Sequence, residues 1–152
     1  MRMPARVTAG VALMLAAAGC ATTTPEPTLY RKLGMGVIGG GREKIAMIVN
    51  DFVANAAADD RIAGRFKGLN PAAVERLKSN LADQLCEATG GPCSYVGRDM
   101  KTAHRGMNIT ETEWTATVEA LSRALDKNQV APPDRAAILT LLGPMKKDIV
   151  GQ

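Results

Sequence analysis

The chain has 152 residues, which is enough for one domain with a real hydrophobic core and too few for two. Hydrophobic residues make up 46% of it and aromatic residues only 3%, so alanine, valine, leucine, isoleucine and methionine must fill the core, which favours helices. The 19 basic and 15 acidic residues are mixed along the chain, which argues against nucleic-acid binding. The single histidine, His104, excludes multi-histidine metal sites and confines any Ser-His-Asp catalysis to that residue.

The N-terminus has the pattern of a signal peptide over residues 1–19. Arg2 and Arg6 accompany an apolar run over residues 7–18 that is too short to span a bilayer. The Ala-Ala-Gly-Cys sequence ending at Cys20 resembles a bacterial lipobox, which predicts that Cys20 becomes a lipidated N-terminus. An alanine stands where a larger aliphatic residue is usual, and an ordinary cleaved signal with an incidental cysteine is the alternative.

The segment after this leader, residues 20–28, is polar and contains prolines, which is typical of a flexible tether. The folded domain is therefore expected over residues 29–152. The leader predicts an exported protein, anchored by lipid and facing the periplasm or the extracellular side.

Four amphipathic helices are expected in the domain. The first covers residues 42–56, and the second begins at Asn70-Pro71 and ends at Gly90-Gly91. The third begins at the capping box of residues 110–113, and the fourth follows Pro132-Pro133, with a kink at Pro144. Their apolar faces are Ile45, Ile48, Val49, Phe52, Val53 and Ala56; Val74, Leu77, Leu81, Leu85 and Ala88; Trp114, Val118, Leu121 and Leu125; and Ile138, Leu141, Leu142, Met145 and Ile149.

Residues 34–39 match the GxGxxG fingerprint of dinucleotide-binding proteins. That fingerprint requires a buried strand before it, whereas residues 29–33 are short and half charged. The sequence favours a flexible linker between two helices, with nucleotide binding as the alternative.

Cys86 and Cys93 flank the turn residues Gly90, Gly91 and Pro92, so the chain can fold back and bring the two sulfurs together. Outside the cytoplasm this spacing predicts a disulfide, and two buried free thiols are the alternative. Zinc is not expected because neither cysteine spacing is Cys-x-x-Cys.

The stretch from Pro92 to Asn108 is loosely patterned and long for so small a domain, which indicates a functional segment. Residues 95–110, Tyr-Val-Gly-Arg-Asp-Met-Lys-Thr-Ala-His-Arg-Gly-Met-Asn-Ile-Thr, resemble the segment of group I truncated haemoglobins that supplies the proximal iron ligand. The resemblance extends to the family's opening helix at residues 29–34 and to its second helix and turn at residues 51–52, 58–62 and 66. It also covers the glycine pair, within residues 87–91, and the last helix at residues 141–145.

This resemblance implies an all-α, two-over-two helical sandwich that holds haem b (iron protoporphyrin IX) non-covalently. No Cys-x-x-Cys-His motif for covalent attachment is present. His104 is the expected proximal ligand, and Arg98 and Lys101 are candidates for the haem propionates, although a solvated pair is the alternative. The expected haem-packing residues, some of which would otherwise be plain core, are Phe52, Phe66, Leu77, Leu81, Leu85, Tyr95, Met100, Met107 and Ile109.

The sequence departs from the family pattern on the distal side, where the gas would bind. Many members place a tyrosine directly after the phenylalanine of the second helix, where it donates a hydrogen bond to bound oxygen, and here this residue is Val53. Without such a donor, oxygen is expected to leave faster. The distal pocket is expected to contain Val53, Asn80 and Gln84, with Gln84 as the replacement donor. Residues 35–40 form a longer link than is usual in the family.

The implied function is reversible binding of oxygen, with nitric oxide or carbon monoxide as further ligands. The resemblance also implies that the protein could catalyse nitric oxide dioxygenation, which would require an unidentified reductase. A role as an oxygen carrier or sensor is the alternative to this enzymatic role. The alternative class is a haem-free helical envelope lipoprotein that serves as an interaction module. Electron transfer or peroxide chemistry at the same haem is a third reading. Membrane contact is expected only through the N-terminal lipid.

Overall fold

The computed structural model describes residues 25–152. The predicted signal peptide and Cys20 lie outside the described residues. The helical elements, in chain order, are α1 (Leu29–Leu33), α2 (Gly40–Ala57), η1 (Ala63–Arg65), α3 (Pro71–Ala88), α4 (Met100–His104), α5 (Glu111–Lys127), α6 (Pro132–Leu142) and η2 (Gly143–Asp148), where η denotes a 3₁₀ helix. Within residues 25–152, no helix is long and apolar enough to cross a bilayer.

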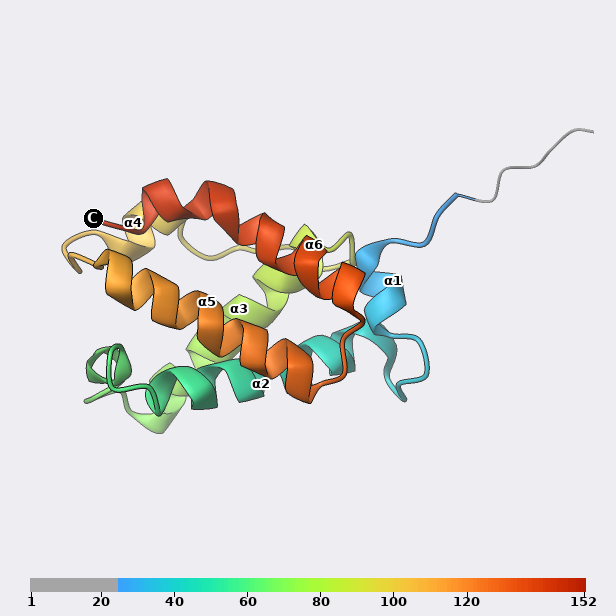
Figure 1. Ribbon diagram of the computed structural model, residues 1–152, viewed down its shortest axis with the longest axis horizontal. Coiled ribbons are helices and arrows are strands. Elements are labelled where there is room, and N and C mark those ends of the chain that lie inside the picture. Colours follow the sequence, from blue (N-terminus) through green and yellow to red (C-terminus); the bar gives the residue numbers. More distant parts are fainter. Residues whose placement is uncertain (1–24) are drawn as a thin grey trace, which may run out of the picture.

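The architecture is an all-α sandwich of two helix pairs, as expected. Helix α2 packs against both α3 and α5, and α5 in turn contacts α6. Figure 1 shows α5 between α2 and the α6–η2 segment, with α1 at one end of the molecule and α4 beside the C-terminus at the other. The pocket described below lies among these helices.

The apolar faces of α2 and α5 form the centre of the core. Ile45 and Ile48 of α2 are 1% and 0% exposed, and Ala124 and Leu125 of α5 are both 0% exposed. Ile138 of α6 joins the same cluster. The predicted periodicity of these helices is therefore confirmed.

Two helix starts follow the predicted capping chemistry. The Asn70 side chain accepts a hydrogen bond from the Ala73 backbone amide at 2.8 Å, with Pro71 at the first helical position. At the start of α5, Thr110 and Glu113 form a reciprocal capping box. Because these bonds are local, the sequence was sufficient to predict them.

The fourth predicted helix differs from expectation at its C-terminal half. The α-helix ends at Leu142, and the chain continues as the tighter 3₁₀ helix η2 instead of a kinked α-helix. Pro144 explains the change because it lacks an amide hydrogen and its ring clashes with the carbonyl one turn earlier.

The glycine-rich segment before α2 is a linker between helices. Residues 29–33 form α1, so the strand required by a dinucleotide fingerprint is replaced by a helix. A Cβ atom on Gly41 would lie 2.5 Å from the Tyr30 carbonyl oxygen, and one on Gly34 would lie 2.3 Å from the Gly41 nitrogen. These glycines therefore allow α1 to lie directly against the start of α2.

Candidate functional site

A cavity of about 510 Å³ opens between the helix pairs. This volume lies within the range of small-molecule and cofactor sites, roughly 300–1,000 Å³. Its walls come from α2, η1, α3, the segment from Tyr95 to Ile109, α5, α6 and η2, and most of the lining is apolar. The sequence-predicted pocket residues all line it: Phe52, Val53, Phe66, Leu77, Asn80, Leu81, Gln84, Leu85, Tyr95, Met100, His104, Met107 and Ile109.

His104 is the last residue of α4 and is half-buried at the cavity. Its Nδ1 lies 2.8 Å from the Met100 carbonyl oxygen. A carbonyl oxygen can only accept, so Nδ1 must carry the hydrogen of the neutral ring. The other nitrogen, Nε2, then keeps its lone pair, which is the state that a metal ligand requires.

Helix α4 was not predicted, although it carries His104. The Asp99 side chain starts it by accepting a hydrogen bond from the Thr102 backbone amide at 2.9 Å. This bond holds the pKa of the Asp99 carboxyl below its usual value. Five residues are too few to show a helical period, and the Asp99 cap was the signal that could have revealed the helix.

Tyr95 reaches the cavity from the chain before α4. Its hydroxyl donates a hydrogen bond to the Arg98 carbonyl oxygen at 2.7 Å, and its backbone amide donates to the Glu87 carboxylate at 3.4 Å. Burial raises the pKa of the Tyr95 hydroxyl, and the nearby Asp99 carboxylate adds to the shift. The tyrosine therefore presents a neutral ring to the cavity.

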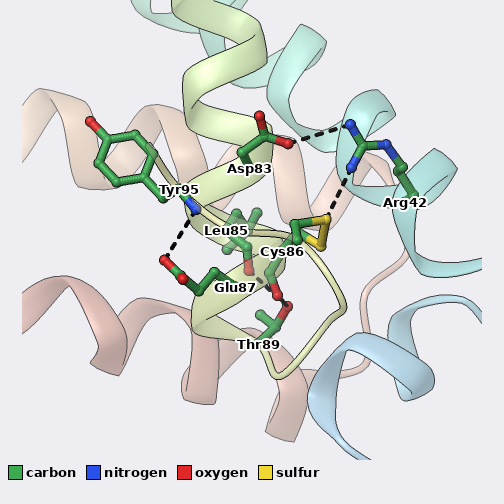
Figure 2. The surroundings of a disulfide bond; sticks show 8 residues. Arg42, Asp83, Leu85, Cys86, Glu87, Thr89 and Tyr95 are labelled. Atoms are coloured by element: carbon green, nitrogen blue, oxygen red, sulfur yellow. Dashed lines mark hydrogen bonds and ion pairs between the residues drawn. A yellow bond between two sulfur atoms is a disulfide. The ribbon is translucent and has the colours of Figure 1, made fainter. Parts of the chain in front are cut away.

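A disulfide ties this chain segment to the end of α3 (Figure 2). Cys86 and Cys93 are bonded with an S–S distance of 2.06 Å and a Cα–Cα distance of 5.7 Å. Arg42 of α2 donates to the Cys93 sulfur at 3.0 Å and pairs with Asp83 of α3 at 3.3 Å, as Figure 2 shows. Of the two alternatives left by the sequence, the structure has the disulfide rather than free thiols.

Arg65 and Glu113 both line the cavity and form an ion pair, called the clasp below. The Arg65 guanidinium donates to both Glu113 carboxylate oxygens, at 2.6 and 3.0 Å, and to the Met107 carbonyl oxygen at 2.8 Å. The guanidinium and the Thr110 amide lower the pKa of Glu113 to about 2. The clasp joins η1 to the chain just after His104, and sequence reasoning missed it because its members are 48 residues apart.

The predicted propionate partners lie at α4. Arg98 precedes this helix and Lys101 is in its first turn; both are exposed and neither lines the cavity, so their contact with propionates stays a prediction. The opposite wall carries the predicted distal residues. Val53 is 5% exposed, Asn80 is exposed, and the Gln84 amide lies 3.5 Å from the Met100 sulfur.

The lining also contains residues that sequence reasoning assigned only to helix packing. They come from α5, α6, η2 and the residue that follows η2, and no signal in their periodicity separates core from cavity. They are Trp114, Leu121, Ile138, Leu141, Leu142, Met145 and Ile149.

These residues fit a haem group. A porphyrin supplies four nitrogens to its iron and needs a neutral imidazole and apolar walls from the protein. The cavity offers both, through His104 Nε2 and the leucine, valine and phenylalanine side chains. Within residues 25–152, no group of three or more His, Cys, Asp or Glu side chains could hold a bare metal ion.

Comparisons with known proteins agree with this geometry. The family model described as bacterial-like globin matches residues 28–150. "Group 1 truncated hemoglobin GlbN" of Mycolicibacterium paratuberculosis is 31% identical over 110 residues, covering 72% of this chain and 79% of that protein. The group 1 truncated hemoglobin of Tetrahymena thermophila is 29% identical and covers 84% of this chain and 98% of its own length.

Solved structures show the same fold. The truncated hemoglobin of Tetrahymena pyriformis in its Fe(III) form superimposes with a TM-score of 0.73 at 27% identity, over 83% of this chain and 100% of that one. The 2/2 hemoglobin of Synechococcus sp. PCC 7002, which has a covalently attached heme, gives a TM-score of 0.70 at 25% identity, over 82% and 98% of the two chains. The chain thus belongs to the bacterial-like globins and, within them, to the truncated haemoglobins.

Proposed function

We propose that this truncated globin binds haem b non-covalently through His104 and uses it to bind oxygen and other diatomic gases reversibly. The observation that carries the proposal is the hydrogen bond from His104 Nδ1 to the Met100 carbonyl oxygen, because in the neutral ring it leaves the lone pair on Nε2 of a residue that lines the cavity. When bound, haem supplies an iron that takes up O₂, nitric oxide or carbon monoxide.

In this proposal the remaining pocket residues hold the group and exclude water. Phe52 and Phe66 provide flat aromatic surface on the α2–η1 side, and Leu77, Leu81 and Leu85 present aliphatic surface from α3. Tyr95, Met100, Met107 and Ile109 pack from the side of His104. Val53, Asn80 and Gln84 form the distal pocket.

The side chains that could form a covalent link support the proposal of a non-covalent haem. A link through sulfur requires a free thiol, and the two cysteines within residues 25–152, Cys86 and Cys93, are joined to each other. A link through a second histidine would need one besides His104, and the chain has one histidine in all.

Haem spectroscopy of the purified protein tests the proposal. Adding haem to the apoprotein should produce a Soret band with 1:1 stoichiometry, and reduction under CO should shift it. His104→Gly should lose the ferrous spectrum of the native protein and regain it when imidazole is added. Arg31→Ala, a change at an exposed residue of α1 that does not line the cavity, is the control and should leave the spectrum intact. If haem produces no Soret band, the chain is instead a haem-free helical interaction module.

Nitric oxide dioxygenation is the enzymatic form of this proposal. In that reaction NO and O₂ combine to nitrate while the iron gives up one electron, so an external reductase must restore it after each turnover. Stopped-flow mixing of the oxygenated protein with NO should then yield one nitrate per haem. If NO is consumed without nitrate, the protein is a carrier or a sensor.

The proposed location is outside the cytoplasm, with residues 1–19 removed, Cys20 lipidated and residues 20–28 as a tether. The Cys86–Cys93 disulfide supports an oxidising compartment. Metabolic labelling with a radioactive fatty acid should modify the native chain and leave Cys20→Ala unlabelled. Labelling that persists in Cys20→Ala would remove the anchor from the proposal.

A further inference from the structure

The hydrogen-bond donors of the cavity are almost all engaged within the protein. At the clasp, the Arg65 guanidinium is bonded to Glu113 and to the Met107 carbonyl. The Thr117 hydroxyl donates to the Glu113 carbonyl oxygen at 2.8 Å, so it presents only lone pairs to the cavity. Three of the five Arg65 N–H hydrogens are thus engaged, and this guanidinium belongs to η1 rather than to the α2–α3 wall.

The donors nearer to His104 are engaged as well. The Tyr95 hydroxyl donates to the Arg98 carbonyl oxygen. The Gln84 amide, on the opposite wall, lies 3.5 Å from the Met100 sulfur, a weak acceptor. One of the two Gln84 N–H hydrogens is thus directed at α4.

Two further lining side chains carry donors, and neither is a buried residue of the α2–α3 wall. Asn80 is exposed, so water can bond its amide. The Trp114 indole stands in the first turn of α5, on a different wall from α2 and α3. On the α2–α3 wall, the buried Val53 and the partly buried Leu81 are aliphatic.

The polarity of the side chains around a haem determines which gases it binds preferentially. Bound O₂ draws electron density from iron and becomes partly negative, so a nearby N–H or O–H donor slows its release; CO and NO stay nearly neutral and gain little. We propose that the aliphatic α2–α3 wall makes this cavity selective for CO and NO over O₂. The inference rests on the proposed function, since it requires haem on His104.

Adding a donor to this wall should reverse the selectivity. Val53→Tyr should slow O₂ dissociation by about tenfold to hundredfold, because a hydrogen bond to a charged group has that effect on an equilibrium. CO dissociation should change far less, so the ratio of CO affinity to O₂ affinity falls by a similar factor. Leu81→Gln offers the same test from α3 if Val53→Tyr does not fold.

The vibration of bound CO provides a readout that is independent of any activity. The native protein should show a single C–O stretching band at the high frequency of an apolar environment, and Val53→Tyr should lower it. Conversely, removing a donor in Gln84→Leu, Asn80→Leu or Trp114→Phe should not raise the C–O frequency or speed O₂ release. Faster O₂ release in any of these three variants would identify a working donor and overturn the proposal.

Failure of this inference can be separated from failure of the proposed function. A native protein that forms a Soret band but releases O₂ slowly, with a low-frequency C–O band, overturns the selectivity and keeps the haem site. A protein that forms no Soret band overturns both.

Discussion

The two sides of the cavity are built by different forces. The α2–α3 wall consists of two 18-residue helices whose apolar side chains pack into the core with α5. The His104 side, residues 89–110, contains one five-residue helix and is held by a disulfide, the Asp99 cap and the Arg65 clasp. One side therefore depends on hydrophobic burial over many residues, and the other on a few specific bonds.

Core truncation should have the largest effect, and it should act on the whole domain. Ile48→Ala, at a side chain that is 0% exposed, should lower the free energy of unfolding by about 2–5 kcal/mol, because it removes buried methylene groups and leaves a void. Urea unfolding followed by circular dichroism measures it. Met47→Ala, at the neighbouring residue that is 44% exposed, should change stability by about 0.5 kcal/mol or less. Equal losses in both variants would contradict the assignment of the core.

Breaking the disulfide should have the next largest effect and should act mainly on the His104 side. The bridge spans a sequence separation of 7, and chain entropy alone predicts a loss of about 2.5 kcal/mol in Cys86→Ser/Cys93→Ser. The haem dissociation rate should rise, and hydrogen exchange should accelerate first in residues 89–104. A reducing agent should reproduce both effects in the native protein and add nothing in the double variant. Exchange that accelerates uniformly would refute a local role.

Removing a helix cap should have a smaller effect than breaking the disulfide, and the two caps should affect different sides of the cavity. Asn70→Ala removes the side-chain acceptor at the start of α3 and should cost about 1 kcal/mol of global stability, measured by urea unfolding. Asp99→Ala removes the corresponding acceptor for α4, and its effect should show as faster hydrogen exchange at α4 and a weaker iron–histidine bond in resonance Raman spectra. If Asp99→Ala leaves the Raman spectrum unchanged, α4 is held by its other contacts.

Acidification should have the smallest effect, because solvent screens the clasp. The pKa of Glu113 is about 2 in the folded protein, below its unfolded value of 4.5, so its contribution to stability is complete above about pH 4.5 and disappears as the pH falls towards 2. Glu113→Gln should therefore weaken the pH dependence of the unfolding free energy in that window. Arg65→Met breaks the same ion pair by removing the guanidinium and should weaken the pH dependence of the unfolding free energy equally. An unaltered slope in both variants would argue against the clasp.

Prediction from the sequence succeeded where the signal was local or periodic. Ile45 and Ile48 recur at the spacing of one helix face, Asn70 and Thr110 are three residues from the groups that they cap, and Cys86 and Cys93 flank a turn. The family resemblance added the grouping of the pocket residues, which line one cavity.

Prediction failed where the decisive partner is distant in the chain or the element is short. Helix α4 has too few residues to show a period, and Pro144 converts the last helix to a 3₁₀ helix rather than kinking it. The Arg65–Glu113 pair and the direction of Gln84 depend on how η1, α3, α4 and α5 come together.

The sequence by itself determined the helix faces, the caps and the choice of His104 as the one imidazole, because each depends on residue type and near spacing. Only the tertiary structure decided which nitrogen of His104 stays free and which cavity donors are engaged. Those properties arise from hydrogen bonds whose direction exists only after the helices have packed, whereas hydrophobic burial has no direction and can be predicted from the periodicity of the chain.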